Sequence, residues 1–197
     1  MNIFLALILS ALIAYSLGSL NFAIIFSFLF KKQDIRLHGS KNAGMTNIIR
    51  VYGYLLGILV LLCDFFKAVI AIYLCNFLFL NIEKYSLYGS LITGLFVIIG
   101  HLYPLYFNFK GGKGVASSAG VIFTQDIRLF VFVISVFLIV LFIKRIVAVA
   151  SVSAAISYPI STLIFFKDYL SVVFSLMIAG LVIYSHKSNI EKLMKKQ

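Results

Sequence analysis

Three segments of the chain combine basic side chains with glycines, hydroxyls and amides. They are the first cationic segment (residues 34–50), the glycine-rich segment (residues 107–118) and the C-terminal segment (residues 184–192). Glycines let backbone N–H groups turn toward an anion, and hydroxyl and amide side chains add further donors. This composition predicts binding of a phosphate-bearing substrate, and the alternative is a set of plain basic loops.

The glycine-rich segment places three glycines and two lysines just before a predicted helix start, where anions are favoured. It is not a nucleotide-binding P-loop, because Gly112-Lys113 is followed by Gly114 and not by Ser or Thr. In the C-terminal segment, His186 and Asn189 would share one helical face if a helix continues through them. Paired carboxylates suited to a hard divalent metal are not apparent, so no metal site is predicted.

The composition predicts a membrane protein. Of the 197 residues, 62% are hydrophobic and only 12% are charged, against about 45–50% and about 25% in soluble domains. We predict an all-α, polytopic membrane helix bundle of about seven transmembrane helices, forming a single domain over residues 1–197. The predicted spans are Asn2–Phe30, Val51–Leu80, Tyr85–Phe109, Val115–Thr124, Ile127–Ile143, Ile146–Phe166 and Tyr169–Tyr184. The fourth is short, because a helix needs about 20 residues to cross the hydrocarbon.

The positive charges predict the orientation, since cytoplasmic loops carry an excess of Lys and Arg. With the N-terminus outside and seven crossings, thirteen of the 17 basic residues fall on inner segments and three on outer ones. The C-terminus and all three polar segments then face the cytoplasm. Within the second span, Asp64 and Lys67 predict a buried ion pair, and the Gly53/Gly57 spacing predicts close helix packing.

Several motifs, in order along the chain, resemble those of a known family. They are GHLYP at residues 100–104, FKGGKGVAS at 109–117, HKSNI at 186–190 and above all GSKNAGMTNIIR at 39–50. The chain resembles the PlsY family of acyl-phosphate:glycerol-3-phosphate acyltransferases over essentially its whole length. It departs from the family pattern at Lys41, where a small residue such as Gly is usual, and it ends before the terminal Gly-x-Glu is complete.

The resemblance implies an enzyme of the bacterial inner membrane whose active face is cytoplasmic. It would transfer a fatty acyl group from acyl phosphate to the 1-hydroxyl of glycerol 3-phosphate, giving lysophosphatidic acid and phosphate. This is the first step of membrane phospholipid synthesis. The implied partners are these two substrates, the lipid bilayer and the soluble acyl-phosphate synthase PlsX. Nucleic acid is not expected as a partner, and neither coenzyme A nor any other cofactor or metal is expected.

The resemblance also implies roles for individual residues. Phosphate groups would be bound by Ser40, Asn42, Thr46 and Arg50, acyl phosphate by Lys113 with Gly111, Gly112 and Gly114, and the site would be completed by His186, Asn189 and Ser151. Among these, His186, Asn189, Lys113 and Ser40 are expected to be catalytic. The proton of the attacking hydroxyl would go to His186 or, as we favour, to the substrate phosphate.

Other functions remain open from the residues alone. A small transporter or scramblase for an anionic lipid or phosphate ester is the main alternative, and a non-catalytic membrane subunit is another. An acyl-CoA-dependent acyltransferase is the nearest enzymatic alternative. It is disfavoured because His186 and Glu191 form HxxxxE, where many such enzymes have HxxxxD.

Overall fold

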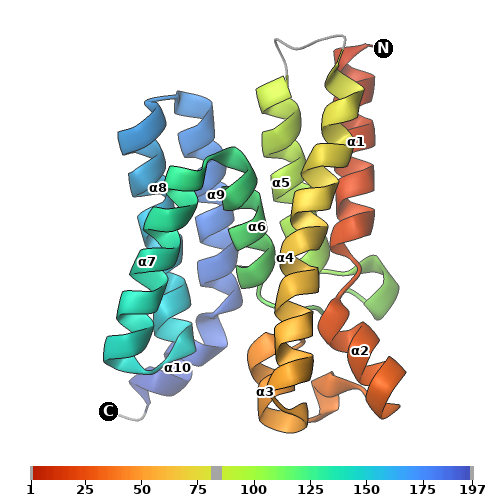
Figure 1. The fold of residues 1–197 in the computed structure, drawn as a ribbon, viewed down its shortest axis with the longest axis vertical. Coiled ribbons are helices and arrows are strands. Elements are labelled where there is room, and N and C mark those ends of the chain that lie inside the picture. The colour runs from red at the N-terminus through yellow and green to blue at the C-terminus, as the bar shows by residue number, and fades with distance from the viewer. Residues whose placement is uncertain (1, 81–85, 196–197) are drawn as a thin grey trace. The chain divides into compact units, whose positions relative to one another are not determined.

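A computed structural model describes residues 2–80 and 86–195, and the regular elements among them are all helices. The predicted all-α class is confirmed. The helices fall into two compact units, Met1–Val121 and Ile122–Gln197 (Figure 1).

The first unit is built on three long helices, α1, α4 and α5, that pack against one another, and the shorter α2 and α3 lie at one end of α4 (Figure 1). Its elements are α1 (Ile3–Gly18), α2 (Phe22–Lys31), η1 (Ile35–Leu37), α3 (Met45–Tyr52), α4 (Tyr54–Asn76), η2 (Phe77–Phe79), α5 (Ser86–Leu102), η4 (Leu105–Phe107) and most of α6 (Val115–Gln125).

Two glycines allow α1 and α5 to approach closely. A Cβ atom at Gly18 would overlap the backbone of Val97, and one at Gly100 would overlap the carbonyl of Tyr15. The Tyr15 hydroxyl also donates to the carbonyl of Tyr103 at 2.8 Å. Small residues at such contacts are typical of membrane helices, whose association depends on close backbone packing.

The first predicted span is not one continuous helix. Helix α1 ends at Gly18 and α2 begins at Phe22, and Asn21 caps α2 by accepting a hydrogen bond from the Ile24 N–H at 3.1 Å. A break inside a membrane span leaves backbone groups that water cannot satisfy. Here the Leu20 carbonyl accepts from the Lys67 ammonium at 2.8 Å, so a side chain of α4 stabilises the break.

The predicted Asp64–Lys67 ion pair is present, with Lys67 Nζ 2.8 Å from Asp64 Oδ1. A third polar side chain joins it, because His101 Nδ1 lies 2.9 Å from Lys67 Nζ. All three residues are buried. We call Asp64, Lys67 and His101 the buried polar cluster.

Close helix packing was predicted for both Gly53 and Gly57 at the start of the second span, but only one of them has this role. Gly57 does allow close packing, since a Cβ there would overlap the Ile49 side chain of α3. Gly53 instead has a φ of +94° with open space around it, and it separates α3 from α4. The second span therefore begins at Tyr54 and not at Val51.

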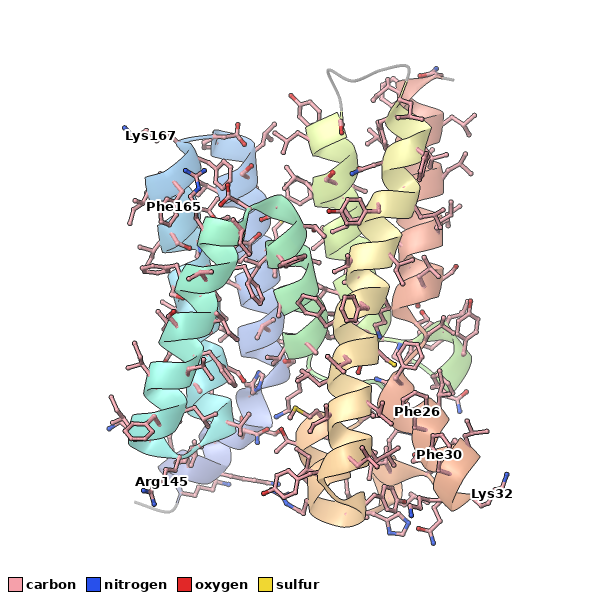
Figure 2. The ribbon with its side chains drawn as sticks, in the orientation of Figure 1. Phe26, Phe30, Lys32, Arg145, Phe165 and Lys167 are labelled. Atoms are coloured by element: carbon pink, nitrogen blue, oxygen red, sulfur yellow. The ribbon has the colours of Figure 1, made fainter. Side chains whose placement is uncertain are left out.

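The second unit contains the antiparallel helices α7 (Ile127–Lys144), α8 (Val147–Phe166) and α9 (Tyr169–Ser185), followed by the short α10 (Lys187–Met194). Helices α7 and α8 end at Arg145 and Lys167, which take left-handed φ values of 55° and 52°. Figure 2 shows these two basic residues at opposite ends of α8.

Among the described residues, five helices or helix pairs are long and apolar enough to cross a membrane, and six if α9 and α10 form one bent span. Helix α6 has 11 residues and so covers about 16 Å, short of the roughly 30 Å hydrocarbon core. The number of seven crossings and the orientation stay predictions. The predicted outer loop with Glu83 and Lys84 lies outside the described residues.

We predict that replacing Lys67 alone with Met strongly destabilises the protein, because it leaves the Asp64 carboxylate buried without its cation. Removing one partner of a buried pair costs about 3–5 kcal/mol. The double replacement Asp64→Leu with Lys67→Met removes the stranded charge and should recover part of this loss. Thermal unfolding in detergent micelles measures both, and a double variant no more stable than Lys67→Met would contradict the prediction.

Candidate active site

The first cationic segment is folded around the side chain of Asn47, which is almost completely buried. Its Oδ1 accepts from the Ser40 N–H at 2.8 Å. Its Nδ2 donates to three backbone carbonyls, those of Ile35, His38 and Asn42, at 3.0–3.3 Å. A Cβ at Gly39 would overlap the same Oδ1. Asn47 therefore sets the path of the loop that carries Ser40 and Asn42.

The four predicted phosphate ligands of this segment lie on the loop before α3 and on α3 itself. Ser40 is exposed on the loop, and Asn42 is half-buried two residues later. Thr46 and Arg50 are both exposed and stand four residues apart on α3, so they occupy one helical face. A hydroxyl, an amide and a guanidinium are thus available to an anion beside this loop.

Lys41 occupies a backbone conformation that favours glycine, the small residue expected at this position from the family resemblance. Its φ is +61°, in the left-handed region that glycine adopts freely and other residues adopt at a cost. Two contacts hold the loop in this conformation although the residue is a lysine. One is the set of hydrogen bonds from Asn47, and the other is the hydrogen bond from the Lys41 N–H to the His38 carbonyl at 2.9 Å.

Asp34 and Arg36 form a bridge at the start of the segment, with Arg36 Nη2 2.7 Å from Asp34 Oδ2. The hydrogen bonds from Arg36 hold the pKa of the Asp34 carboxyl below its usual value. The carboxylate form, and with it the bridge, is therefore maintained at neutral pH and is lost only as the pH falls below that lowered pKa.

The glycine-rich segment is tied back to the end of α5. The Gly111 N–H donates to the Leu102 carbonyl and the Gly112 N–H to the His101 carbonyl, each at 3.1 Å. These two N–H groups are therefore engaged within the protein, which argues against the predicted phosphate cradle formed by their donation. Gly114, with a φ of +78°, begins the turn into α6.

The first cationic segment and the glycine-rich segment meet at Gly112. A Cβ atom there would overlap both the Ala43 carbonyl of the first cationic segment and Nε2 of His101. The Asn21 side chain donates to the same Ala43 carbonyl at 3.3 Å. Glycine is thus required at residue 112, because the backbones of the two segments and the buried polar cluster pack together there. Lys113 is the next residue.

In the second unit, His186 is the junction between α9 and α10, which meet at a bend of 52°. The helix does not continue straight through His186 and Asn189, so they do not share the face of one straight helix. His186 is buried, and its Nδ1 lies 2.8 Å from the Val182 carbonyl. A carbonyl only accepts, so Nδ1 carries the proton, and the lone pair of the neutral ring is on Nε2.

Ser151 is buried within α8, and its hydroxyl donates to the Val147 carbonyl at 2.9 Å. Its proton is therefore engaged within its own helix, which leaves only acceptor capacity and does not favour a role as a phosphate donor.

Sequence reasoning missed the roles of Asn47 and Arg36. Asn47 stands in the quoted motif at residues 39–50 and Arg36 in the first cationic segment, but neither was given a role of its own, whereas the structure uses their donors to hold backbone carbonyls. One signal was available for Arg36: the pattern Asp-x-Arg occurs at residues 34–36 and again at 126–128, before a helical turn in both places.

Comparisons with known proteins agree on one family. The family model described as glycerol-3-phosphate acyltransferase matches residues 8–196. The chain belongs to this family. A glycerol-3-phosphate acyltransferase of Coxiella burnetii is 43% identical over 97% of this chain and 96% of the relative. One of Finegoldia magna is 40% identical over 97% of this chain and 94% of the relative.

Solved structures support the same assignment. The crystal structure of the integral membrane glycerol 3-phosphate acyltransferase PlsY, in its glycerol 3-phosphate form, matches with a TM-score of 0.87 at 33% identity, covering 96% of this chain and 92% of that one. Its lysophosphatidic acid form matches with a TM-score of 0.84 at 32% identity. This member of the glycerol-3-phosphate acyltransferase family is therefore an acyltransferase and an integral membrane protein.

We predict that Gly112→Ala lowers acyltransferase turnover at least tenfold, because the added methyl group displaces the backbone next to Lys113 from the Ala43 carbonyl and the His101 ring. Displacements of about 1 Å cost up to about a hundredfold in rate. Gly180→Ala is the matched control, since a Cβ there meets nothing within 4 Å and alanine favours a helix interior. Equal turnover in the two variants would contradict the prediction, because it would show that close packing at Gly112 is not needed for activity.

Proposed function

We propose that this acyltransferase transfers a fatty acyl group from acyl phosphate to the 1-hydroxyl of glycerol 3-phosphate, giving lysophosphatidic acid and phosphate. The family match over residues 8–196, together with the meeting of the first cationic segment and the glycine-rich segment at Gly112, is the observation that carries the proposal. The similar PlsY structure was solved in forms named for glycerol 3-phosphate and lysophosphatidic acid, the acceptor and product of this reaction.

The chemistry of the donor fits the residues that are present. An acyl phosphate is a mixed anhydride whose phosphate leaves readily, so the enzyme needs no covalent nucleophile. The acceptor oxygen attacks the acyl carbon, and the bond to the phosphate oxygen breaks with its electron pair. Positioning the two anions and offsetting their charge supplies most of the acceleration. Lys113, Arg50, Ser40, Asn42 and Thr46 are the side chains proposed for this task.

The proton of the attacking hydroxyl has two candidate acceptors. One is Nε2 of His186, which the hydrogen bond from Nδ1 to the Val182 carbonyl leaves as the basic nitrogen. The other is a phosphate oxygen of the substrate, which already lies next to the reacting atoms. We favour the phosphate, with His186 and Asn189 contributing to substrate binding.

The distribution of basic residues supports a location for the reaction. We propose a multi-pass protein of the bacterial inner membrane, forming one functional domain over residues 1–197, with the N-terminus outside and the active face in the cytoplasm. Soluble PlsX is then a natural source of acyl phosphate on that side. This orientation is supported by the thirteen basic residues of the predicted inner segments.

We expect purified protein in lipid vesicles to form lysophosphatidic acid from glycerol 3-phosphate with palmitoyl phosphate but not with palmitoyl-CoA. Product only from palmitoyl-CoA would contradict the proposed donor, and no product from either would favour transport. Lys113→Ala and Arg50→Ala should each lower turnover by about a hundredfold or more, as the loss of a charge-stabilising donor does. Lys144→Ala, an exposed position at the end of α7, is the control with the same charge change.

We expect His186→Asn to retain turnover within about tenfold of the parent. The asparagine amide can still donate to the Val182 carbonyl but cannot act as a base, so this variant separates the two proton acceptors. Loss of a general base typically costs about a hundredfold or more. A drop of that size, measured as kcat with palmitoyl phosphate, would assign the proton to His186 instead.

A further inference from the structure

The Asp34–Arg36 bridge orients a guanidinium group at the edge of the first cationic segment. Asp34 Oδ1 accepts from the Arg36 N–H at 2.9 Å, which closes the turn η1. Arg36 Nε donates to the same oxygen at 3.0 Å, and Nη2 donates to Oδ2 at 2.7 Å. Such a two-point contact fixes the plane of the guanidinium as well as its position.

The remaining amino group of Arg36 points to the glycine-rich segment. Nη1 donates to the Phe107 carbonyl at 2.7 Å and to the Lys110 carbonyl at 3.0 Å. These contacts join parts of the chain that lie 71 and 74 residues apart. The side chain is only 20% exposed. One arginine therefore holds the carboxylate of one segment and two carbonyls of the other, and we call this arrangement the Arg36 clamp.

The turn between the Phe107 and Lys110 carbonyls has a strained backbone that needs to be held in place. Asn108 and Phe109 both have a φ of 57°, a left-handed conformation that residues with side chains rarely adopt, still less two in succession. The Arg36 clamp lies across this turn, and Gly111 and Gly112 are tied to α5 directly after it. Lys113 is the next residue, so its backbone position depends on both attachments.

We propose that Arg36 is a positioning residue that fixes the glycine-rich segment against the first cationic segment, so that Lys113 and the ligands Ser40 to Arg50 act on the same pair of substrates. The catalytic part of this proposal rests on the proposed function. The structural part concerns only the path of residues 107–113. Because Nε and Nη2 donate to Asp34 and Nη1 donates to two backbone carbonyls, this proposal has Arg36 act through Lys113 and not by touching the substrate.

The chain contains a matched control for the clamp. Asp126 and Arg128 form the same bridge at the start of α7, with the Arg128 N–H donating to Asp126 Oδ1 at 2.7 Å and Nη2 to Oδ2 at 2.9 Å. There the guanidinium carbon lies over the Phe165 ring at 5.7 Å, within the second unit. Arg128→Lys and Asp126→Asn thus make the same chemical changes as Arg36→Lys and Asp34→Asn in a part of the chain outside the first cationic segment and the glycine-rich segment.

Limited trypsin digestion of the purified protein in detergent tests the structural part without any substrate. Arg36→Lys keeps the cleavage site at residue 36 but removes the forked contact, and Asp34→Asn keeps the cap but removes the charge. Both should raise the rate of cleavage after Lys110 severalfold, whereas the two control variants should leave it unchanged. An unchanged rate in Arg36→Lys and Asp34→Asn would overturn the proposal.

Steady-state kinetics with palmitoyl phosphate test the catalytic part. Arg36→Lys should lower kcat by about tenfold to a hundredfold, the range expected for a displaced reacting group. KM for glycerol 3-phosphate and the thermal unfolding midpoint should remain close to those of Arg128→Lys. In Arg36→Ala, millimolar guanidinium chloride should restore part of kcat by occupying the vacated position, which a general loss of folding would not permit.

The two proposals fail separately. Faster cleavage with an unchanged kcat in Arg36→Lys would overturn the positioning role, although the clamp would still hold the loop. A parent protein with no turnover of palmitoyl phosphate would contradict the proposed donor, and the digestion rates alone would then decide whether the Arg36 clamp fixes the glycine-rich segment.

Discussion

The ammonium group of Lys67 lies within 2.9 Å of a carboxylate, an imidazole nitrogen and the Leu20 carbonyl. Each contact supports a different part of the first unit. The carboxylate belongs to α4, the carbonyl closes the break between α1 and α2, and the imidazole belongs to His101, whose own carbonyl holds Gly112. The His101 ring thus lies between α4 and the glycine-rich segment, with Nδ1 next to the Lys67 ammonium and Nε2 next to Gly112.

This arrangement resolves a conflict between the membrane and the chemistry. Binding a phosphate-bearing substrate is favoured by irregular segments that carry polar donors, whereas the hydrocarbon requires every backbone group to be satisfied within the protein. The protein places its irregular segments where side chains supply the missing partners. At the break in the first span, Asn21 accepts from the Ile24 N–H and Lys67 donates to the Leu20 carbonyl. Asn47 satisfies backbone groups of the first cationic segment, and Arg36 satisfies carbonyls of the glycine-rich segment.

Much of this was predictable from the sequence, for identifiable reasons. The long apolar stretches predicted helices because a segment that crosses the hydrocarbon must satisfy its backbone groups internally, and Asp64 with Lys67 predicted a pair because isolated charges are costly there. The break at Leu20 was not predictable, since Gly18 to Asn21 is uncharged and its partner lies on another helix. Gly53 and Gly57 look alike in sequence, and only their surroundings show that one ends a helix and the other packs against Ile49. The engaged N–H groups of Gly111 and Gly112 depend on α5 in the same way.

The break at Leu20 also bears on the order of biogenesis. The first span leaves the ribosome before α4 has been made, and until then the Leu20 carbonyl lacks the lysine that satisfies it. Residues 32–53 are synthesised between α2 and α4, and Lys67 follows Leu20 by 47 residues. The Leu20 carbonyl is therefore satisfied only once α4 has been made and packs against α1 and α2.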